Sequence, residues 1–123
     1  MAVQHIHHEI NYIEFSVTDL EKAKQFYGAA FGWKFTDYGP EYVGIPKHDG
    51  EGEIAGMCKV DFVTSGGPLV VLYSKDLDAS LTSVKEAGAE LTVDITAFPG
   101  GRRFQFHDPF GNELAVWSDD QVN

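Results

Sequence analysis

The sequence predicts an α+β fold in which two tandem βαβββ modules form an eight-stranded cleft, with a helix covering each half-sheet. Two observations support this prediction. Residues 19–32 and 76–88 show apolar side chains at helical spacing, and each segment follows one strand-like segment and precedes three more. The two helical segments also echo each other, TDLEKAKQFYGAAFGWKF being similar to KDLDASLTSVKEAGAEL. Their offset of about 57 residues is longer than a solenoid repeat and fits a duplicated module.

The first module begins with a strand over residues 11–17. Its alternate residues form one apolar face, made by Ile13, Phe15 and Val17. Asp19, or Thr18 before it, caps the helix that follows, and Gly32 ends it. Further strands are expected at 33–38, 42–45 and 54–63, with a loop rich in glycine and proline over 39–53.

The second module repeats this order. A strand over 69–74 leads to a helix that begins after Asp76 and ends at Gly88. Three more strands are expected at 91–95, 102–107 and 113–118, the last two joined by a structural turn, DPFGN. We therefore predict a single domain over residues 1–123, with module 1 at about 10–64 and module 2 at about 67–119.

Composition limits the partners. The formal charge is −10, from 19 acidic and 9 basic residues, so neither nucleic acid nor an anionic membrane is an expected partner. Cys58 is the single cysteine, which excludes an intrachain disulfide and suits a reducing compartment. The N-terminus lacks a signal-peptide pattern, and no apolar run approaches the roughly 20 residues of a membrane span. We expect a cytoplasmic protein.

Three stretches resemble one known family. They are IEFSVTDLEKAKQFYGAAFGW, SKDLDASLTSVKEAGAEL and FHDPFGNELAVW. Together, over about residues 10–119, they resemble the vicinal oxygen chelate superfamily, which includes glyoxalases, bleomycin-resistance proteins and dioxygenases. The resemblance implies a cleft lined by inward residues of both modules, a small-molecule ligand and a homodimer.

The resemblance also implies positions for metal ligands, and this sequence departs from them. The histidine expected seven residues before Asp19 is Tyr12, the second ligand position falls on Leu69 or Val70, and the carboxylate position on the last strand is Ala115. Aliphatic side chains have no lone pair to offer, and neutral tyrosine is a poor ligand. Near the fourth position the only carboxylates are Glu53 and Asp61. We therefore expect no cofactor and no family-type metal, and a divalent metal on displaced ligands remains the alternative.

The N-terminal stretch HIHHEINYIEF holds three histidines, which are candidate metal ligands by residue type. His8 lies roughly 13 Å before Tyr12 along an extended chain. His5 and His7 have the opposite strand parity. We interpret this stretch as exposed chain rather than as part of a metal site.

Alternation along the predicted strands assigns residues to the cleft. The candidate ligand pocket contains Tyr12, Glu14, Leu69, Tyr73, Arg103, Gln105, His107, Ala115 and Trp117. Glu14 is the candidate catalytic residue, as a general base; the alternative is a structural ion pair with Arg103 or a lysine. For His107 the alternative to a catalytic role, and the favoured interpretation, is a surface or hydrogen-bonded residue beside the turn.

Three functions remain open. The first is metal-free binding of a small organic molecule in the cleft. The second is a lyase or isomerase of the glyoxalase type, with displaced metal ligands or with Glu14 as acid and base. The third is an interaction module whose cleft is filled by its own aromatic side chains, such as Tyr12 and Trp117.

Overall fold

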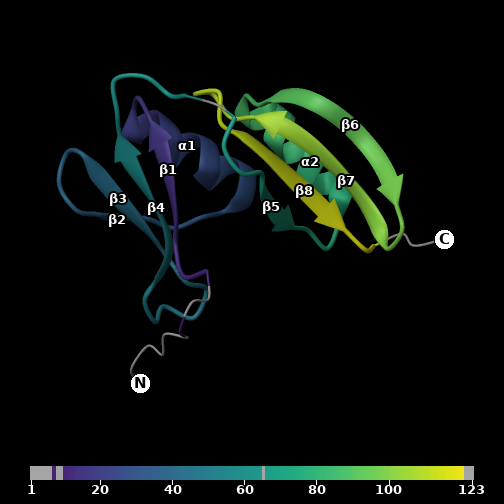
Figure 1. The fold of residues 1–123 in the computed structure, drawn as a ribbon, viewed down its shortest axis with the longest axis horizontal. Helices are drawn as coiled ribbons and strands as arrows, with labels where there is room; N and C mark the ends of the chain where they lie inside the picture. Colours follow the sequence, from purple (N-terminus) through teal and green to yellow (C-terminus); the bar gives the residue numbers. More distant parts are fainter. Residues whose placement is uncertain (1–6, 8–9, 65, 121–123) are drawn as a thin grey trace.

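The computed structural model describes residues 7, 10–64 and 66–120. Two helices and eight strands follow one another in the predicted order (Figure 1). Module 1 contains β1 (Ile13–Val17), α1 (Leu20–Phe31), β2 (Thr36–Asp37), β3 (Tyr42–Pro46) and β4 (Glu53–Lys59). Module 2 contains β5 (Val70–Tyr73), α2 (Leu77–Ala87), β6 (Glu90–Phe98), β7 (Gly101–His107) and β8 (Glu113–Ser118).

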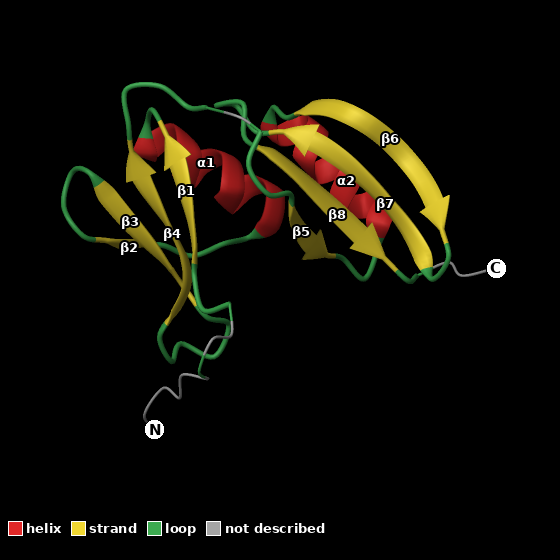
Figure 2. Cartoon of the chain, viewed as in Figure 1, coloured by secondary structure: helices red, strands yellow, loops and turns green. Residues whose placement is uncertain are grey.

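The eight strands form two four-stranded mixed sheets with the same topology (Figure 2). Sheet A has the order β1-β4-β3-β2, and sheet B has the order β5-β8-β7-β6. In each sheet the first strand of the module pairs in parallel with the last, and the other pairs are antiparallel. The predicted α+β fold with two tandem βαβββ modules is confirmed.

Both helices begin and end where the sequence predicts. Asp19 and Asp76 are the N-caps, and their side chains accept hydrogen bonds of 3.1 Å from the third backbone N–H that follows. Gly32 adopts a φ of 71° and Gly88 a φ of 109°, left-handed conformations that end the helices. These signals act within one turn of chain, so the sequence alone suffices to place them.

The strand expected over 33–38 is wrong in extent, because β2 contains only Thr36 and Asp37. Trp33 instead stacks on Tyr27 of α1, with ring centroids 4.8 Å apart and planes 9° apart. The chain after α1 therefore packs against the helix before it reaches the sheet. The strand expected at 91–95 is longer than predicted, since β6 runs from Glu90 to Phe98.

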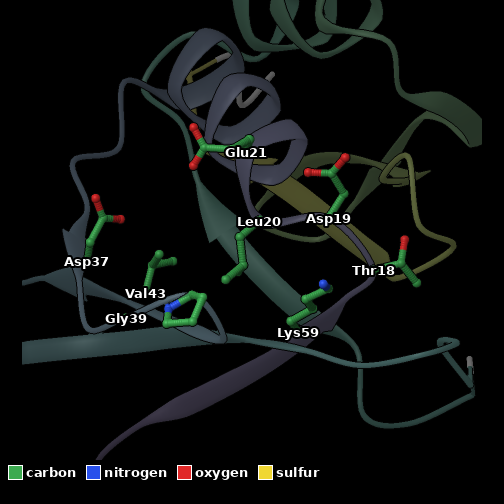
Figure 3. A pocket seen from close by; sticks show the side chains of 9 residues that line it. Thr18, Asp19, Leu20, Glu21, Asp37, Gly39, Val43 and Lys59 are labelled. Atoms are coloured by element: carbon green, nitrogen blue, oxygen red, sulfur yellow. The ribbon is translucent and has the colours of Figure 1, made fainter.

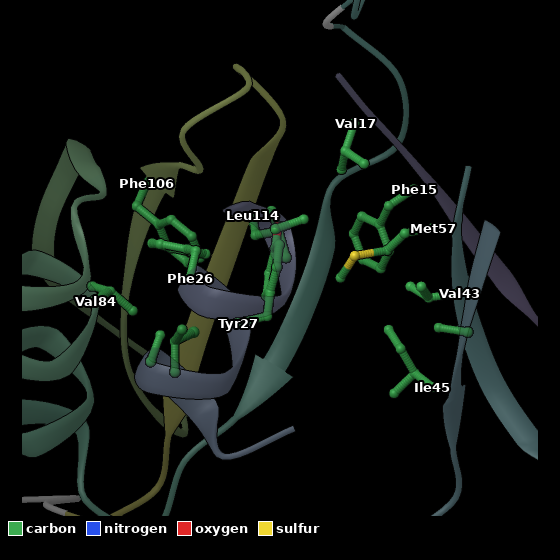
Figure 4. Close-up of a cluster of buried hydrophobic side chains, with 14 of the residues drawn as sticks. Phe15, Val17, Phe26, Tyr27, Val43, Ile45, Met57, Val84, Phe106 and Leu114 are labelled. Atoms are coloured by element: carbon green, nitrogen blue, oxygen red, sulfur yellow. The ribbon is translucent and has the colours of Figure 1, made fainter. Parts of the chain in front are cut away.

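The core contains residues of both modules. Helix α1 lies between the two sheets (Figure 1). Its Phe26 ring lies 6.3 Å from that of Phe106 in β7, while Phe15 of β1 lies 6.0 Å from Tyr27. Figure 4 shows these side chains converging from sheet A, α1 and sheet B. Burying one helix against both modules makes the packing of each depend on the other.

The DPFGN turn also joins the modules. Asp108 is only 4% exposed and accepts a 2.7 Å hydrogen bond from the Tyr27 hydroxyl of α1. The Asn112 side-chain amide donates to the backbone carbonyl of Ser16 in β1, at 2.8 Å. The predicted structural turn between β7 and β8 thus joins module 2 to α1 and β1 of module 1.

Candidate functional site

Tyr12 and Glu14 lie on the open face of sheet A, opposite the core. The buried residues of β1 are Phe15 and Val17, so the neighbouring positions point away from the helix, as alternation predicts. Tyr12 is 36% exposed. Glu14 lies in the edge strand β1 and Tyr12 directly before it, and both side chains lie on the same face of the sheet.

Three further side chains join them. The hydroxyls of Tyr42, in β3, and Tyr12 form a hydrogen bond with each other. The Tyr38 hydroxyl donates to Oε2 of Glu53 at 2.7 Å, and its ring lies 6.5 Å from that of Tyr42. We call this cluster the tyrosine–glutamate face; its members are Tyr12, Glu14, Tyr38, Tyr42 and Glu53.

Two glycines form the floor of this face. Gly44 and Gly56 are opposite each other in the β3–β4 ladder, and Gly56 is opposite Glu14 in the β1–β4 ladder. A Cβ at Gly56 would collide with the hydroxyls of Tyr12 and Tyr42, and one at Gly44 would collide with the Glu53 carboxylate. The missing side chains allow the polar groups to lie directly against the sheet.

The environment raises the pKa of two of these tyrosines. Burial raises the pKa of Tyr42, and hydrogen bonds to Tyr12 and Glu14 raise it further. The hydrogen bond to Glu53 raises the pKa of Tyr38, with a smaller contribution from burial. At neutral pH the hydroxyls of Tyr38 and Tyr42 are therefore protonated, and the face presents them beside two glutamate side chains.

A cavity connects this face to module 2. It has a volume of about 670 Å³ and lies between the edge strands β1 and β5. Tyr12, Glu14 and Leu69 line it, together with Val71 and Glu113. The structure thus brings together three of the predicted pocket residues, from both modules.

The remaining predicted residues lie on the open face of sheet B, in separate groups. Tyr73 and Trp117 pack edge to face with centroids 5.2 Å apart, and the Tyr73 hydroxyl donates to Asp119 at 2.7 Å. Trp117 also lies 6.3 Å from the ring of Phe98. This group is an aromatic patch and not part of the tyrosine–glutamate face.

Arg103 and Gln105 form a second group on sheet B. Arg103 donates to the Gln105 side-chain oxygen at 3.4 Å, and the Gln105 amide donates to Glu113 at 3.1 Å. His107 lies 3.5 Å from Glu90, at the other end of β7. Ala115, which is opposite Gln105 in the β7–β8 ladder, is fully buried. The alternative ion pair between Glu14 and Arg103 does not occur among the described residues.

The metal-ligand positions implied by the family resemblance do not fit a metal. Tyr12 contacts Tyr42, while Leu69 and Ala115 offer no donor atom. Among residues 7, 10–64 and 66–120, no group of three or more His, Cys, Asp or Glu side chains is arranged to hold a metal ion. His7 is exposed, and His5 and His8 lie outside the described residues.

Figure 3 shows another hollow, at the beginning of α1, with a volume of about 610 Å³. Its acidic side chains already have partners. Asp19 caps the helix, while Glu21 and Asp37 form ion pairs with Lys24 at 2.7 Å and 3.1 Å. We therefore do not assign a ligand to this hollow.

Sequence reasoning missed three members of the tyrosine–glutamate face. Tyr38, Tyr42 and Glu53 lie in or beside the segment interpreted as a loop. One signal was available: in YVGIP the residues Tyr42 and Gly44 alternate with Val43 and Ile45, which is the pattern of a strand with one open face. The position of Glu53 over Gly44 depends on pairing between strands and has no local signal.

The fold and these open sheet faces define a protein of paired βαβββ modules. The chain belongs to the Glyoxalase/Bleomycin resistance protein/Dioxygenase superfamily, which it matches over residues 9–116. A curated relative, a glyoxylase-like domain-containing protein from Didymella fabae, is 33% identical over 122 residues, covering 90% of this chain and 94% of the relative.

Solved structures share the fold. A glyoxalase-related enzyme from Fulvimarina pelagi has a TM-score of 0.76 at 22% identity, covering 90% of this chain and 88% of that chain. The fosfomycin resistance protein FosX from Mesorhizobium loti has a TM-score of 0.73 at 14% identity, covering 92% and 93%. At these identities the likeness concerns the fold alone. No helix in the described ranges is long and apolar enough to cross a membrane.

Proposed function

We propose that the protein binds a small organic molecule on the tyrosine–glutamate face, without a cofactor or a metal of the family type. The observation that carries this proposal is the gathering of three tyrosines and two glutamates over a two-glycine floor. Small-molecule sites combine apolar or aromatic walls with a few convergent polar groups. Tyrosine supplies both a flat ring and a hydroxyl donor, and a carboxylate accepts hydrogen bonds.

We further propose that a homodimer completes the site. β1 and β5 are both edge strands, and unpaired strand edges favour association. The open face of sheet B leaves Val71 44% and Tyr73 57% exposed. A second copy that lays its sheet B over the tyrosine–glutamate face would bring the remaining predicted pocket residues to the ligand, namely Tyr73, Arg103, Gln105, His107 and Trp117. We expect this assembly in the cytoplasm, where Cys58 stays reduced.

Thermal-shift screening against cationic glycopeptides and aromatic metabolites tests ligand binding. A hit is expected to raise the Tm of the wild type but not of Tyr42→Phe or Glu14→Gln. The matched control is Glu86→Gln, an exposed glutamate on α2, which is expected to respond as the wild type does. Equal stabilisation of all four proteins would place the ligand elsewhere. Light scattering during gel filtration tests the dimer, and a monomeric mass at micromolar concentration would refute it.

Elemental analysis tests the absence of a metal. The protein for this measurement carries alanine in place of His5, His7 and His8, because histidines bind stray Ni or Zn. We expect less than stoichiometric metal. Stoichiometric Ni, Zn, Fe or Mn in this variant would contradict the metal-free proposal and favour displaced ligands.

One observation favours a second candidate, a lyase or isomerase of the glyoxalase type. Glu14 lies close enough to raise the pKa of the Tyr42 hydroxyl, so a carboxylate and a protonated phenol lie side by side on an open face. Such a pair provides a base and an acid for proton transfer. If an activity is found, Glu14→Gln is expected to lower kcat by roughly 100-fold or more. An unchanged kcat would exclude Glu14 as the base.

A further inference from the structure

A second cavity lies on the other side of sheet A from the tyrosine–glutamate face. It has a volume of about 680 Å³ and is bounded by the core face of sheet A, the end of α1 and strand β5. Its walls are apolar, formed by the side chains Phe15, Phe31, Trp33, Ile45 and Leu72. Figure 4 shows Phe15 and Ile45 projecting from sheet A on this core side. The volume falls in the range of about 300–1,000 Å³ typical of small-molecule sites.

Two lysines and a histidine lie along this cavity. Lys34, Lys47 and His48 line it, and no carboxylate occurs among its described lining residues. This is unusual in a chain with 19 acidic and 9 basic residues. In the described structure the side chains of Lys34, Lys47 and His48 form no ion pair or hydrogen bond. Most of the described acidic residues elsewhere in the chain lie on the surface and form no ion pair with them.

Backbone hydrogen bonds hold the chain in place at Lys47. Lys47 follows β3, and its N–H donates to the carbonyl of Gly52 at 2.9 Å, while its carbonyl accepts from Gly50 at 2.9 Å. Lys34 follows Gly32, the C-cap of α1, and the stacked ring of Trp33. Both lysines therefore follow defined points of the backbone, and both line the same apolar cavity.

We propose that this cavity binds an amphipathic monocarboxylate, such as a medium-chain fatty acid. The hydrocarbon tail fills the apolar cavity, where its burial supplies most of the affinity. The carboxylate lies at the rim, where Lys34 and Lys47 donate charge-assisted hydrogen bonds. This site goes beyond the proposed function and does not depend on it, because the tyrosine–glutamate face lies on the opposite side of the sheet. The cavity between β1 and β5 adjoins this site and shares Ile13, Phe15 and Val70 as lining residues.

Calorimetry with three probes of equal chain length tests the charge preference. Dodecanoate and dodecyltrimethylammonium are titrated below their critical micelle concentrations, and dodecanol below its solubility limit. Dodecanoate is expected to bind with a Kd roughly tenfold or more lower than that of dodecanol, and the cationic probe is expected to bind most weakly. Equal affinity for dodecanoate and dodecanol, or no saturable dodecanoate binding, would overturn the proposal.

A double variant locates the site. Lys34→Gln/Lys47→Gln is expected to weaken dodecanoate binding roughly tenfold and leave dodecanol binding unchanged. Lys75→Gln/Lys85→Gln removes the same charge from module 2 and is expected to bind dodecanoate as the wild type does. Unchanged dodecanoate binding in the first variant, or an equal loss in both, refutes the rim assignment. Circular dichroism checks that both variants fold.

Two further measurements separate this site from the first. In Trp117→Phe the remaining tryptophan, Trp33, lines the cavity, so dodecanoate is expected to change its fluorescence. Tyr42→Phe is expected to leave dodecanoate binding intact, since Tyr42 lies on the other face. Loss of dodecanoate binding in Tyr42→Phe would show that the acid occupies the tyrosine–glutamate face instead.

Discussion

Asp108 shows how a single residue can hold two modules together. Its carboxylate is nearly fully buried, and a buried carboxylate is costly unless hydrogen bonds replace its water. Four donors do so: the Tyr27 hydroxyl at 2.7 Å, the backbone N–H groups of Phe110 and Asn112 at 2.9 Å, and the Asn112 amide at 3.0 Å. Three of these donors belong to the turn itself. Tyr27 is the donor that comes from module 1.

Tyr27→Phe is therefore expected to destabilise the protein. The substitution keeps the ring in the core but removes one donor from a buried carboxylate, which costs about 1–3 kcal/mol. Urea denaturation followed by circular dichroism measures this free energy of unfolding. Tyr73→Phe is the matched control, because the Tyr73 hydroxyl donates to Asp119 at the exposed surface. A loss in the control equal to that in Tyr27→Phe would contradict the explanation.

Tyr27 also predicts that the free energy of unfolding falls at alkaline pH. Burial and the neighbouring Asp108 carboxylate raise the pKa of Tyr27 well above its ordinary value of 10.0. Above pH 10 the unfolded chain releases this proton while the folded protein retains it. Stability from this group is thus complete below pH 10 and falls above it, by up to about 1.4 kcal/mol per pH unit. Denaturation between pH 8 and 11 is expected to give a steeper loss for the wild type than for Tyr27→Phe, and parallel profiles would refute this.

At the scale of elements, two glycines have different neighbours. Gly56 lies under the open face of sheet A, and Gly101 lies at the start of β7, beside β8. At Gly56 an added Cβ meets the hydroxyls of Tyr12 and Tyr42 and the Tyr42 ring carbon that carries the hydroxyl, all at the far ends of side chains that can rotate away. At Gly101 it meets the backbone carbonyl of Ser118, which the β7–β8 ladder holds in place. Gly56 therefore leaves room for the tyrosines of the candidate site, and Gly101 allows the backbones of β7 and β8 to lie close together.

Gly56→Ala and Gly101→Ala are therefore expected to differ. Gly56→Ala changes the free energy of unfolding by less than about 1 kcal/mol, since only flexible side-chain ends shift. It separates the tyrosine pair and is expected to abolish any ligand-induced rise in Tm assigned to this face. Gly101→Ala costs about 1–3 kcal/mol through overpacking. Chemical denaturation of the two variants checks the order, and a larger loss in Gly56→Ala would refute it.

How far the sequence predicts an element depends on the range of the signal. The caps at Asp19 and Asp76 and the open positions Tyr12 and Glu14 are correct, because capping and alternation act over a few residues. The grouping of site residues is a different problem. Whether Glu14 lies near Tyr42 or near Arg103 depends on which strands pair and how the sheets are arranged, and those are long-range properties. The pocket assignments of Tyr73, Arg103, Gln105, His107, Ala115 and Trp117 stay predictions.

At the scale of the whole molecule, neither module buries its apolar surface alone. Sheet A is covered on its core face by α1, and α1 also packs on Phe106 of β7 and against α2. A sheet of four short strands with one helix is too small for a large core of its own. Removing either module would expose the shared side chains of α1. We therefore expect the two repeats to unfold as one cooperative unit, and the module limits at about 10–64 and 67–119 stay predictions.

The two tryptophans allow this cooperativity to be measured. Trp33 lies in module 1 and Trp117 in module 2, so Trp117→Phe and Trp33→Phe each leave a fluorescent probe in a single module. In each variant the fluorescence transition in urea is expected to coincide with the circular dichroism transition, as two-state unfolding requires. Comparing the two signals within one variant removes the effect of each substitution on stability. A Trp33 transition that precedes loss of secondary structure would mean that module 1 opens first, and α1 would then not couple the modules.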